Sequence, residues 1–423
     1  MDGDIRKSDI RQFLDDLEKQ AHTLYATVLA LPESLFWIVQ EDTEQTFSVA
    51  GFIENYENFD SCLDSFCVGF NVYFFRDEWD EIVSDWELTD NLYNGEDRFE
   101  ASFTFYGFRY LKVEGLDGEI DPDDFKVAVI FSDLAETGSF SSSNDLVNQL
   151  QSNIQWGLRG NFVDIPTDCP QRDERLGWAG DAQVFFRTAT FNRDVQSFFR
   201  KWLKDVSADQ LPDGQVTDII PMITGLVGAG HTGWADVATI VPWQHYMAYG
   251  DKRILENQFP SMKAWVDFIV SQCSEQYLWN TGWHYGDWLF YSVDNDTSGV
   301  SAVTYKPLIQ QCFFANSADV TAKAAAVLGL EKEAAYYADV AAKAREAFCN
   351  AYLTPAGYLV SATQTAYVLA LNFDMLPEPM RPVVAARLAD KVREYGHITT
   401  GFLGTPYICH VLSEWPHSCR LPS

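Results

Sequence analysis

The sequence has few positively charged residues and no long apolar run. Its 423 residues contain 30 Lys and Arg against 61 Asp and Glu, which gives a formal net charge of -31 at pH 7. Such a field repels polyanions, and no cluster of Lys and Arg forms a local exception, so nucleic acid is not an expected partner. No stretch of about 18 apolar residues occurs, which argues against a spanning helix and a membrane partner.

The N-terminal residues also lack the apolar core of a signal peptide. Charged residues recur from Met1 to Gln20, whereas a secretory signal has an apolar segment before its cleavage site. The eight cysteines form neither a CxxC pair nor a Cys/His ligand set, which favours reduced thiols. These absences predict a cytoplasmic protein, and they say nothing about its oligomeric state.

Aromatic side chains are what the sequence has in excess. They make up 15% of the chain, with 13 Trp, 19 Tyr and 30 Phe. This surplus suits a surface that stacks on sugar rings. Because a domain typically has about 150 residues, the length predicts two or more domains.

The N-terminal third divides into two parts. Residues 1–70 contain a predicted helix at Ile10–Leu31 and then lose any clear period, so this segment is unassigned. From 71 to 136, short aromatic and β-branched runs separated by acidic and Gly-containing turns are typical of an antiparallel β-sandwich, here partial. The predicted strands are Val72–Phe75, Ala101–Val113 and Phe125–Phe131.

From residue 137 to the end, the hydrophobic period is that of helices. Ser143 or Asn144 is placed to cap the first helix, whose apolar face contains Leu146 and Leu150. Further helices are predicted near 181–191, 194–206, 236–249, 253–273, 304–328, 331–351, 362–373, 378–394 and 402–414. About ten helices with almost no strands between them predict a mainly α toroid or solenoid.

One segment concentrates charged residues beside tryptophan. It is NFVDIPTDCPQRDERLGWAGDAQ, residues 161–183. Such a density of charge does not suit a helix interior, so the segment is predicted to be a loop that enters a helix near Asp181. Pro170, Gly177 and Gly180 are expected to supply its bends. Loops on a rigid scaffold are where binding and catalytic side chains gather.

The hydrolysis of a glycosidic bond needs residues of the kinds found in this segment. One carboxyl group must be held protonated while a second stays ionised. Glu174 has the like-charged neighbour Asp173, which can raise its pKa, and Arg172 and Arg175 can keep a second carboxylate ionised. The alternative is a surface network of ion pairs.

The run DCPQRDERLGWAGDAQ resembles the bacterial α-L-rhamnosidases of glycoside hydrolase family 78. The resemblance extends from about Phe103 to Glu414. Its further motifs are FTFYGFRYLKVEG, Phe191-Asn192, Lys201–Asp205, Gly233–Asp236, Ile240–Trp243, Gly286–Trp288 and His397–Gly404. It implies an inverting hydrolase that releases terminal α-L-rhamnose from rhamnosides without a cofactor, on an (α/α)6 barrel preceded by a β-sandwich.

The resemblance also implies roles for individual residues. Glu174 of DERLGW would be the general acid. The residues that would line the rhamnose subsite are Asp168, Arg172, Trp178, Asp181, Trp234 and Trp288. The indoles would contact the sugar ring and its C6 methyl group. For Trp234 and Trp288, packing in the core is the alternative.

The general base has no counterpart in this sequence. In the family it follows the segment that matches Thr399–Glu414, and no position here matches it. The barrel is therefore expected to lack its last helices through C-terminal truncation, and turnover is expected to be impaired. Two alternatives stay open: a non-catalytic or vestigial rhamnoside-binding protein, and a related (α/α)6 glycosidase of another specificity.

Two short patterns resemble other binding motifs. Gly228–Gly233 spells GxGxxG but lacks the strand-to-helix context of a dinucleotide site, so no cofactor is expected. Asp294–Gly299 begins like a calcium loop but lacks the acidic twelfth ligand. The histidines His231, His245 and His284 have no zinc-ligand spacing, so no metal is predicted.

Overall fold

The computed structural model describes two compact units. One consists of residues 1–130 with 169–174, and the other of residues 131–168 with 175–423. The residues described in full are Phe105, 128–172, 174–223, 228–292 and 302–415, together with the backbone of five strands between residues 37 and 114. The helix predicted at Ile10–Leu31 lies outside the described residues.

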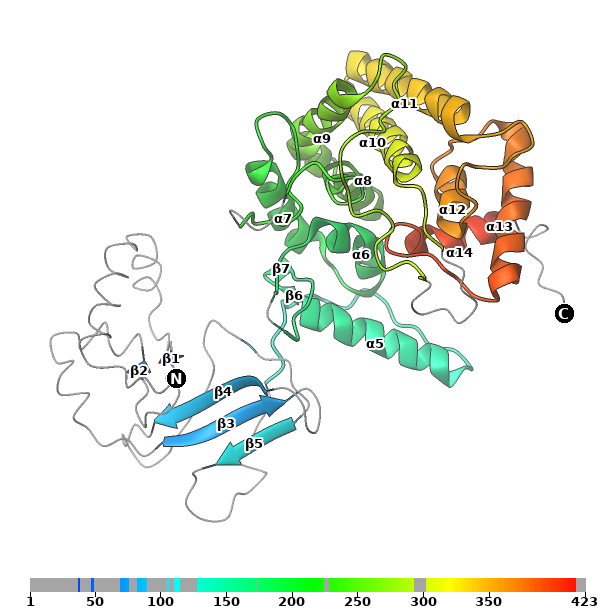
Figure 1. Cartoon of the computed structure of the whole chain (residues 1–423). Helices are drawn as coiled ribbons and strands as arrows, with labels where there is room; N and C mark the ends of the chain where they lie inside the picture. Colours follow the sequence, from blue (N-terminus) through cyan, green and yellow to red (C-terminus); the bar gives the residue numbers. More distant parts are fainter. Residues whose placement is uncertain are drawn as a thin grey trace, which may run out of the picture. The chain divides into compact units, whose positions relative to one another are not determined.

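The first unit contains a three-stranded antiparallel sheet (Figure 1). Its central strand is β3 (Gly69–Phe75), which pairs with β4 (Ile82–Thr89) on one side and with β5 (Tyr110–Glu114) on the other. A separate pair is formed by β1 (Trp37–Ile38) and β2 (Phe47–Ser48). A β-sandwich needs a second packed sheet, so that part of the fold stays a prediction.

The sequence located these strands unevenly. β3 confirms the strand at Val72–Phe75, and β5 confirms only the C-terminal end of Ala101–Val113. β4 was not predicted, although its apolar residues alternate with Asp85 and Glu87. The strand predicted at Phe125–Phe131 is wrong over residues 128–131, which are irregular.

The second unit is mainly helical, as predicted. The helices among its described residues are α5 (Asp145–Asn161), α6 (Ala179–Asn192), α7 (Gln196–Asp209), α8 (Val237–Tyr249), α9 (Lys252–Gln272), α10 (Lys306–Leu328), α11 (Glu331–Tyr352), α12 (Gln364–Asn372), α13 (Arg381–Tyr395) and α14 (Thr405–Glu414). Each overlaps a helix expected from the hydrophobic period. The short strands β6 (Phe162–Val163) and β7 (Ile165–Pro166) pair between α5 and α6, and the 3-10 turn η4 (Glu378–Met380) precedes α13.

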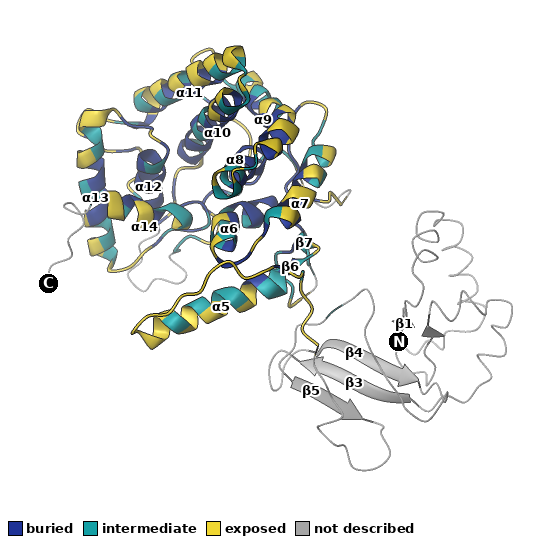
Figure 2. Cartoon of the chain, turned by 180° about the vertical axis from the view of Figure 1, so that it is seen from behind, coloured by how far each residue is buried: buried dark blue, intermediate teal, exposed yellow. Residues whose placement is uncertain are grey.

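The helices alternate between an inner and an outer layer. Along the inner layer α6 packs on α8, α8 on α10, α10 on α12 and α12 on α14. Outside them, α9 packs on α8, α11 on α10 and α13 on α12 (Figure 2). The sequence explains the difference, because α12 is mostly apolar and is buried on all sides from Gln364 to Leu371, whereas α11 is buried along one stripe only. Helical hairpins of this kind build a toroid.

The first helix of this unit has the cap that its sequence predicts. The Asn144 side chain accepts hydrogen bonds from the backbone N–H groups of Leu146 and Val147. Its apolar face is nevertheless largely exposed, with Leu146 80% and Leu150 57% exposed. Packing against the toroid therefore contributes less to this helix than its periodicity suggests.

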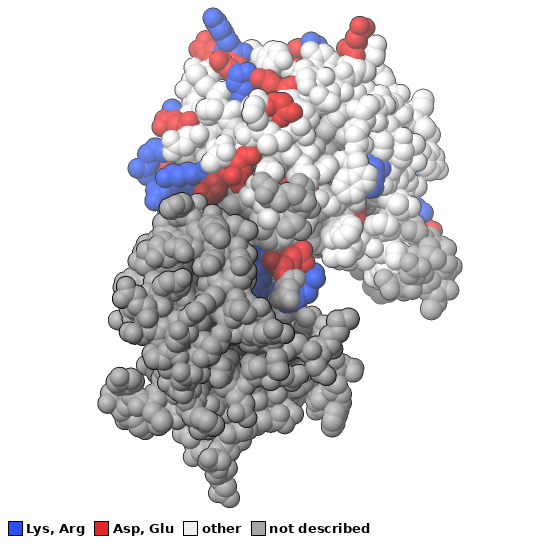
Figure 3. Space-filling model, turned by 60° about the vertical axis from the view of Figure 1, so that its left-hand side comes forward, with Lys and Arg blue, Asp and Glu red and all other residues white. Residues whose placement is uncertain are grey.

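The described surface carries charges of both signs. On the face drawn in Figure 3, Lys and Arg side chains are interspersed with Asp and Glu side chains. Ion pairs one helical turn apart contribute to this mixture, as at Lys263–Asp267 and Lys343–Asp339. Among the helices that the structure describes, none has both the length and the apolar composition needed to span a membrane.

Candidate functional site

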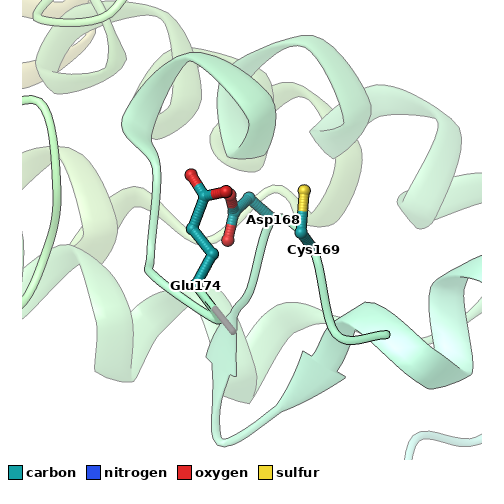
Figure 4. Close-up of side chains that lie close together, drawn as sticks. All are labelled: Asp168, Cys169 and Glu174. Atoms are coloured by element: carbon teal, nitrogen blue, oxygen red, sulfur yellow. The ribbon is translucent and has the colours of Figure 1, made fainter. Parts of the chain in front are cut away.

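The charged segment found in the sequence forms the connection between β7 and α6. Its ends are joined, because Asp168 N donates to the Leu176 carbonyl at 3.0 Å and Leu176 N donates to Asp168 Oδ1 at 2.9 Å. Asn161 Nδ2 donates to the Asp168 carbonyl at 2.6 Å. The segment is therefore a loop, as predicted, and the structure adds that hydrogen bonds of Asp168 hold its two ends together. Figure 4 shows Asp168, Cys169 and Glu174, which all belong to this connection.

Gly177 and Gly180 allow close packing rather than bends. A Cβ atom at Gly177 would collide with the carbonyl oxygen of Ile220, and one at Gly180 would lie 2.6 Å from the Trp234 ring. Gly180 belongs to the first turn of α6, so the bend predicted there is wrong. The bend predicted at Pro170 is confirmed, because Pro170 and Gln171 form a turn, and Arg175 adopts a left-handed conformation with a φ of 55°.

Glu174 forms an ion pair with Arg172. Arg172 Nη2 and Glu174 Oε2 lie 2.6 Å apart, and 25% of the Glu174 side chain is exposed. A guanidinium group at this distance stabilises an ionised carboxylate. The sequence predicted that Arg172 would hold a second carboxylate, whereas in the structure it pairs with the expected acid itself. Asp173, whose charge was expected to act on Glu174, lies outside the described residues.

The loop contains three side chains of kinds that bind metal ions, but together they do not favour one metal. They are the carboxylates of Asp168 and Glu174 and the thiol of Cys169. Carboxylates suit hard cations such as Ca²⁺, whereas thiolates suit softer ones. Arg172 Nη2 also donates to Cys169 Sγ at 3.3 Å. We therefore assign no metal to this loop.

Near the start of α6, the backbone of residues 216–220 forms hydrogen bonds with two other segments of the chain, one on each side. Ala179 N donates to the Asp218 carbonyl at 2.8 Å on one side. On the other, Asp218 N donates to the Gly228 carbonyl at 3.2 Å. Isolated antiparallel bridges accompany both contacts. This pairing brings Asp218 close to His231, which lies two residues after the bridge at Ala229.

Asp218 is the buried centre of a polar cluster. Its Oδ2 lies 2.5 Å from Nδ1 of His231 and accepts a hydrogen bond from Tyr285 OH at 2.8 Å. The Asp218 side chain has no exposed surface, whereas 17% of the His231 side chain is exposed. Burial raises the pKa of Asp218, while its contacts with His231 and Tyr285 act in the opposite direction.

Tyr285 is surrounded by the tryptophans predicted to bind sugar. Its ring centroid lies 6.0 Å from that of Trp178, 4.4 Å from that of Trp234 and 6.2 Å from that of Trp288. Trp283, which the sequence did not indicate, lies 4.8 Å from it. The fold thus brings three of the predicted subsite residues together around one tyrosine.

These tryptophans differ in how much surface they expose. Trp234 is 3% exposed and stacks at 6.2 Å on Phe402, so its observed contacts are those of a core residue. Trp288 is 49% exposed and Trp283 is 59% exposed. Their free faces are accessible to a ligand, whereas Trp234 could act on one mainly through its neighbours. Contact of Trp234 or Trp288 with a sugar stays a prediction.

Asp181 lies in the first turn of α6 and is partly buried. A carboxylate at this end of a helix is stabilised by the unpaired N–H groups and by the helix dipole. Trp178 is the N-cap residue of the same helix. These two predicted subsite residues therefore share one helix terminus.

Asp287 joins the two C-terminal motifs of the family resemblance. Backbone N–H groups of Gly401, Leu403 and Gly404 donate to its carboxylate at 2.8, 2.8 and 3.2 Å, and Thr365 Oγ1 donates at 2.5 Å. Burial raises the pKa of Asp287, and these four donors act in the opposite direction. The result is a fixed loop carrying the exposed residue next to Asp287, Trp288.

Asp236 has a similar role in the Gly233–Asp236 motif. Its fully buried carboxylate accepts hydrogen bonds from Gly233 N at 2.8 Å, Trp265 Nε1 at 3.0 Å and Ser317 Oγ at 2.6 Å. It therefore links the loop before α8 to α9 and α10. The roles of Asp236 and Asp287 were not predicted, although an acidic residue inside an apolar motif is a usable signal of a buried polar link.

The cluster of Asp218, His231 and Tyr285 was also missed. In the sequence, His231 lies within the GxGxxG pattern and has no zinc-ligand spacing, so nothing there indicates a function for it. The structure explains those glycines, because Gly230 and Gly233 have φ values of 77° and 83°. No local signal pairs Asp218 with His231, since tertiary folding creates that contact.

Comparison with known proteins identifies this architecture. Residues 135–419 match the bacterial alpha-L-rhamnosidase 6 hairpin glycosidase domain. The chain belongs to this family. Residues 80–131 match the concanavalin-like domain of bacterial alpha-L-rhamnosidases. The resemblance drawn from the sequence motifs is thereby confirmed, and so is the mainly α barrel of helical hairpins.

Curated relatives in this rhamnosidase family share much of the sequence. An alpha-L-rhamnosidase of Formosa agariphila is 43% identical over 324 residues, which cover 74% of this chain and 34% of the relative. One of Streptomyces avermitilis is 39% identical over 325 residues, covering 77% of this chain and 30% of the relative. The chain thus spans about a third of the length of these rhamnosidases.

Solved rhamnosidases have the same fold. The Streptomyces avermitilis alpha-L-rhamnosidase complexed with L-rhamnose has a TM-score of 0.76 and 36% identity, covering 83% of this chain and 34% of that one. The native enzyme from Aspergillus terreus has a TM-score of 0.74 and 34% identity, covering 83% of this chain and 42% of that one.

Proposed function

We propose that this chain carries the catalytic domain of an α-L-rhamnosidase, which releases terminal α-L-rhamnose from rhamnosides by hydrolysis. The family match over residues 135–419 supports this function, as do the curated relatives. The structural observation that carries it is the group of tryptophans around Tyr285, at the point where the charged loop enters α6. Indole rings suit the apolar face of a sugar, and carboxylates suit its hydroxyl groups.

In the proposed reaction, Glu174 is the general acid. It protonates the glycosidic oxygen as the bond to the anomeric carbon breaks. Water attacks the opposite face of the sugar, which inverts the configuration, and the proton that this water loses passes to solvent when no general base is present. The side chains proposed to bind the rhamnose are Asp168, Arg172, Trp178, Asp181, Trp234 and Trp288. The acidic and basic groups bind hydroxyls, and the indoles contact the ring and its C6 methyl group.

The Arg172–Glu174 ion pair sets a condition for this mechanism. Glu174 must hold a proton when the substrate is bound, yet Arg172 at 2.6 Å stabilises its ionised form. We expect a bound rhamnoside to draw Arg172 onto a sugar hydroxyl. If the pair persists, the chain binds rhamnosides without cleaving them, which is the non-catalytic alternative.

The second condition for this mechanism is a general base, the group that would take a proton from the attacking water. None of the 423 residues is assigned this role. General-base catalysis typically contributes about 10² to 10⁴ in rate. We therefore expect slow hydrolysis by this chain, reduced by a factor of that size. Rapid turnover would refute the expected impairment.

Release of p-nitrophenol from aryl glycosides of rhamnose, glucose and glucuronic acid tests the function. We expect release from the α-L-rhamnoside alone, and a further drop of about 10² or more for Glu174→Gln, because the variant cannot donate a proton. Glu256→Gln, at an exposed position of α9, is the matched control and should behave as the parent.

Each other outcome identifies a competing function. Preference for the glucuronide would favour a related glycosidase of another specificity. Binding of the rhamnoside with no release from either the parent or the variant would favour the non-catalytic protein. Equal release by the parent and Glu174→Gln would show that Glu174 is not the acid.

A further inference from the structure

We propose that His231 is a sugar-binding residue, held by Asp218 so that its Nε2 atom is presented to a hydroxyl of the bound rhamnoside. This inference rests on the proposed function and adds a residue to the subsite. Neither the loop that carries Glu174 nor the expected subsite residues include His231. Its position follows from the pairing of segment 216–220 with the residues that precede it.

The hydrogen bond to Asp218 determines which ring atom is available. Nδ1 of His231 lies 2.5 Å from Asp218 Oδ2, so the hydrogen bond between these two atoms occupies Nδ1, whichever of them carries the proton. The remaining polar atom of the ring is Nε2. Among the residues described in the structure, Nε2 has no hydrogen-bond partner, and 17% of the side chain is exposed. It is therefore oriented but unused.

Neighbouring groups fix the plane of the imidazole. The ring meets Trp283 edge-on at 5.0 Å and Tyr285 edge-on at 5.4 Å between centroids. On a third side the backbone is close, because a Cβ atom at Gly228 would lie 2.5 Å from His231 Cε1. A side chain restricted in this way is preorganised for a ligand.

The surroundings favour a sugar hydroxyl over other ligands. Trp283, beside the ring, is 59% exposed, and Trp288 is 49% exposed, so apolar faces for a sugar lie on the same cluster. Lys306 Nζ lies 5.1 Å from the centre of the Trp283 ring, and its positive charge disfavours a cation there. An imidazole Nε2 accepts from a hydroxyl when neutral and donates to it when protonated. Either form can therefore bind a sugar.

If His231 had only a structural role, its substitutions would have different effects on binding and stability. In that case His231 would serve only to satisfy the buried carboxylate of Asp218. The two functions reside on different ring atoms, so substitutions can separate them. Asn places its amide nitrogen near the position of Nδ1 and retains the contact with Asp218, whereas Gln reaches the position of Nε2.

Calorimetric titration of the whole 423-residue chain with L-rhamnose tests the proposal. We expect His231→Asn to weaken binding about 3- to 10-fold, the value of one lost hydrogen bond, with an unchanged Tm. His231→Gln should bind more tightly than His231→Asn but unfold at a lower temperature, because it leaves Asp218 without this partner. His410→Asn, an exposed histidine on α14, is the control and should match the parent in both measurements.

Three results would overturn the proposal. The first is His231→Asn binding L-rhamnose as tightly as the parent. The second is a loss of affinity in both His231 variants that follows their loss of Tm, which is the behaviour of a structural residue. The third is no binding by the parent chain, which refutes the proposed function as well, whereas the first two results leave that function intact.

Discussion

Two buried carboxylates in the helical unit, Asp287 and Asp218, differ in how completely their oxygen atoms are hydrogen-bonded. Asp287 accepts from three backbone N–H groups and one hydroxyl, and these donors tie separate loops together. Asp218 Oδ2 has two side-chain partners, and Asp218 Oδ1 is buried with no partner in the described part of the chain. A buried acceptor without a partner is costly and uncommon. We infer that Asp287 stabilises the fold, whereas Asp218 orients His231 at a cost in folding stability.

The largest expected effect is on stability at Asp287. Asp287→Ala leaves four buried donors without an acceptor, so we expect the free energy of unfolding to fall by on the order of 3 kcal/mol. Urea unfolding followed by circular dichroism measures this loss. Asp390→Ala, on the exposed side of α13, is the matched control and should change the free energy by less than about 0.5 kcal/mol. Equal losses of unfolding free energy in the two variants would show that Asp287 stabilises the fold no more than an exposed aspartate does.

A smaller, pH-dependent effect is expected at Asp218. Burial raises the pKa of Asp218 above its ordinary value of 3.8, so the folded state binds this proton more tightly than the unfolded state does. The contribution of Asp218 to stability therefore falls as the pH rises from near 3.8 through the raised pKa. Asp218→Asn lacks this titration, so it should gain stability relative to the parent over the same window.

Unfolding of the parent and Asp218→Asn between pH 4 and pH 7 checks the sign of this difference. The groups that face Asp218 are His231 and Tyr285, so the comparison should be repeated with His231→Asn, which replaces the imidazole in contact with this carboxylate. A difference that shrinks as the pH rises would mean that the folded state stabilises the ionised carboxylate. Asp218 would then resemble Asp287 rather than contrast with it.

Local sequence signals predicted most of the helical fold. The period and the caps located α5 to α14, because burial in two layers imposes a regular apolar stripe on each outer helix and an apolar composition on each inner one. β4 was missed since half of its residues are polar, and no run of apolar residues marks it. The exposed face of α5 shows the limit of periodicity, which indicates a helix but not what covers it.

The candidate site was predictable where its residues lie close together in the sequence. The loop that ends at Trp178 was recognised from its charge and its motif. The contacts of Tyr285 with Trp178 and Trp234 join segments far apart in the chain, so only the fold could reveal them. The same holds for the pairing of Asp218 with His231, which depends on backbone bridges between irregular segments.

A crystal structure of this chain with L-rhamnose bound tests the central claim most directly. We predict that the sugar lies against the exposed face of Trp288, with the Glu174 carboxyl and His231 Nε2 both within hydrogen-bond distance of it and Arg172 moved off Glu174. A sugar bound elsewhere, with the Glu174 carboxyl directed into bulk water, would contradict it.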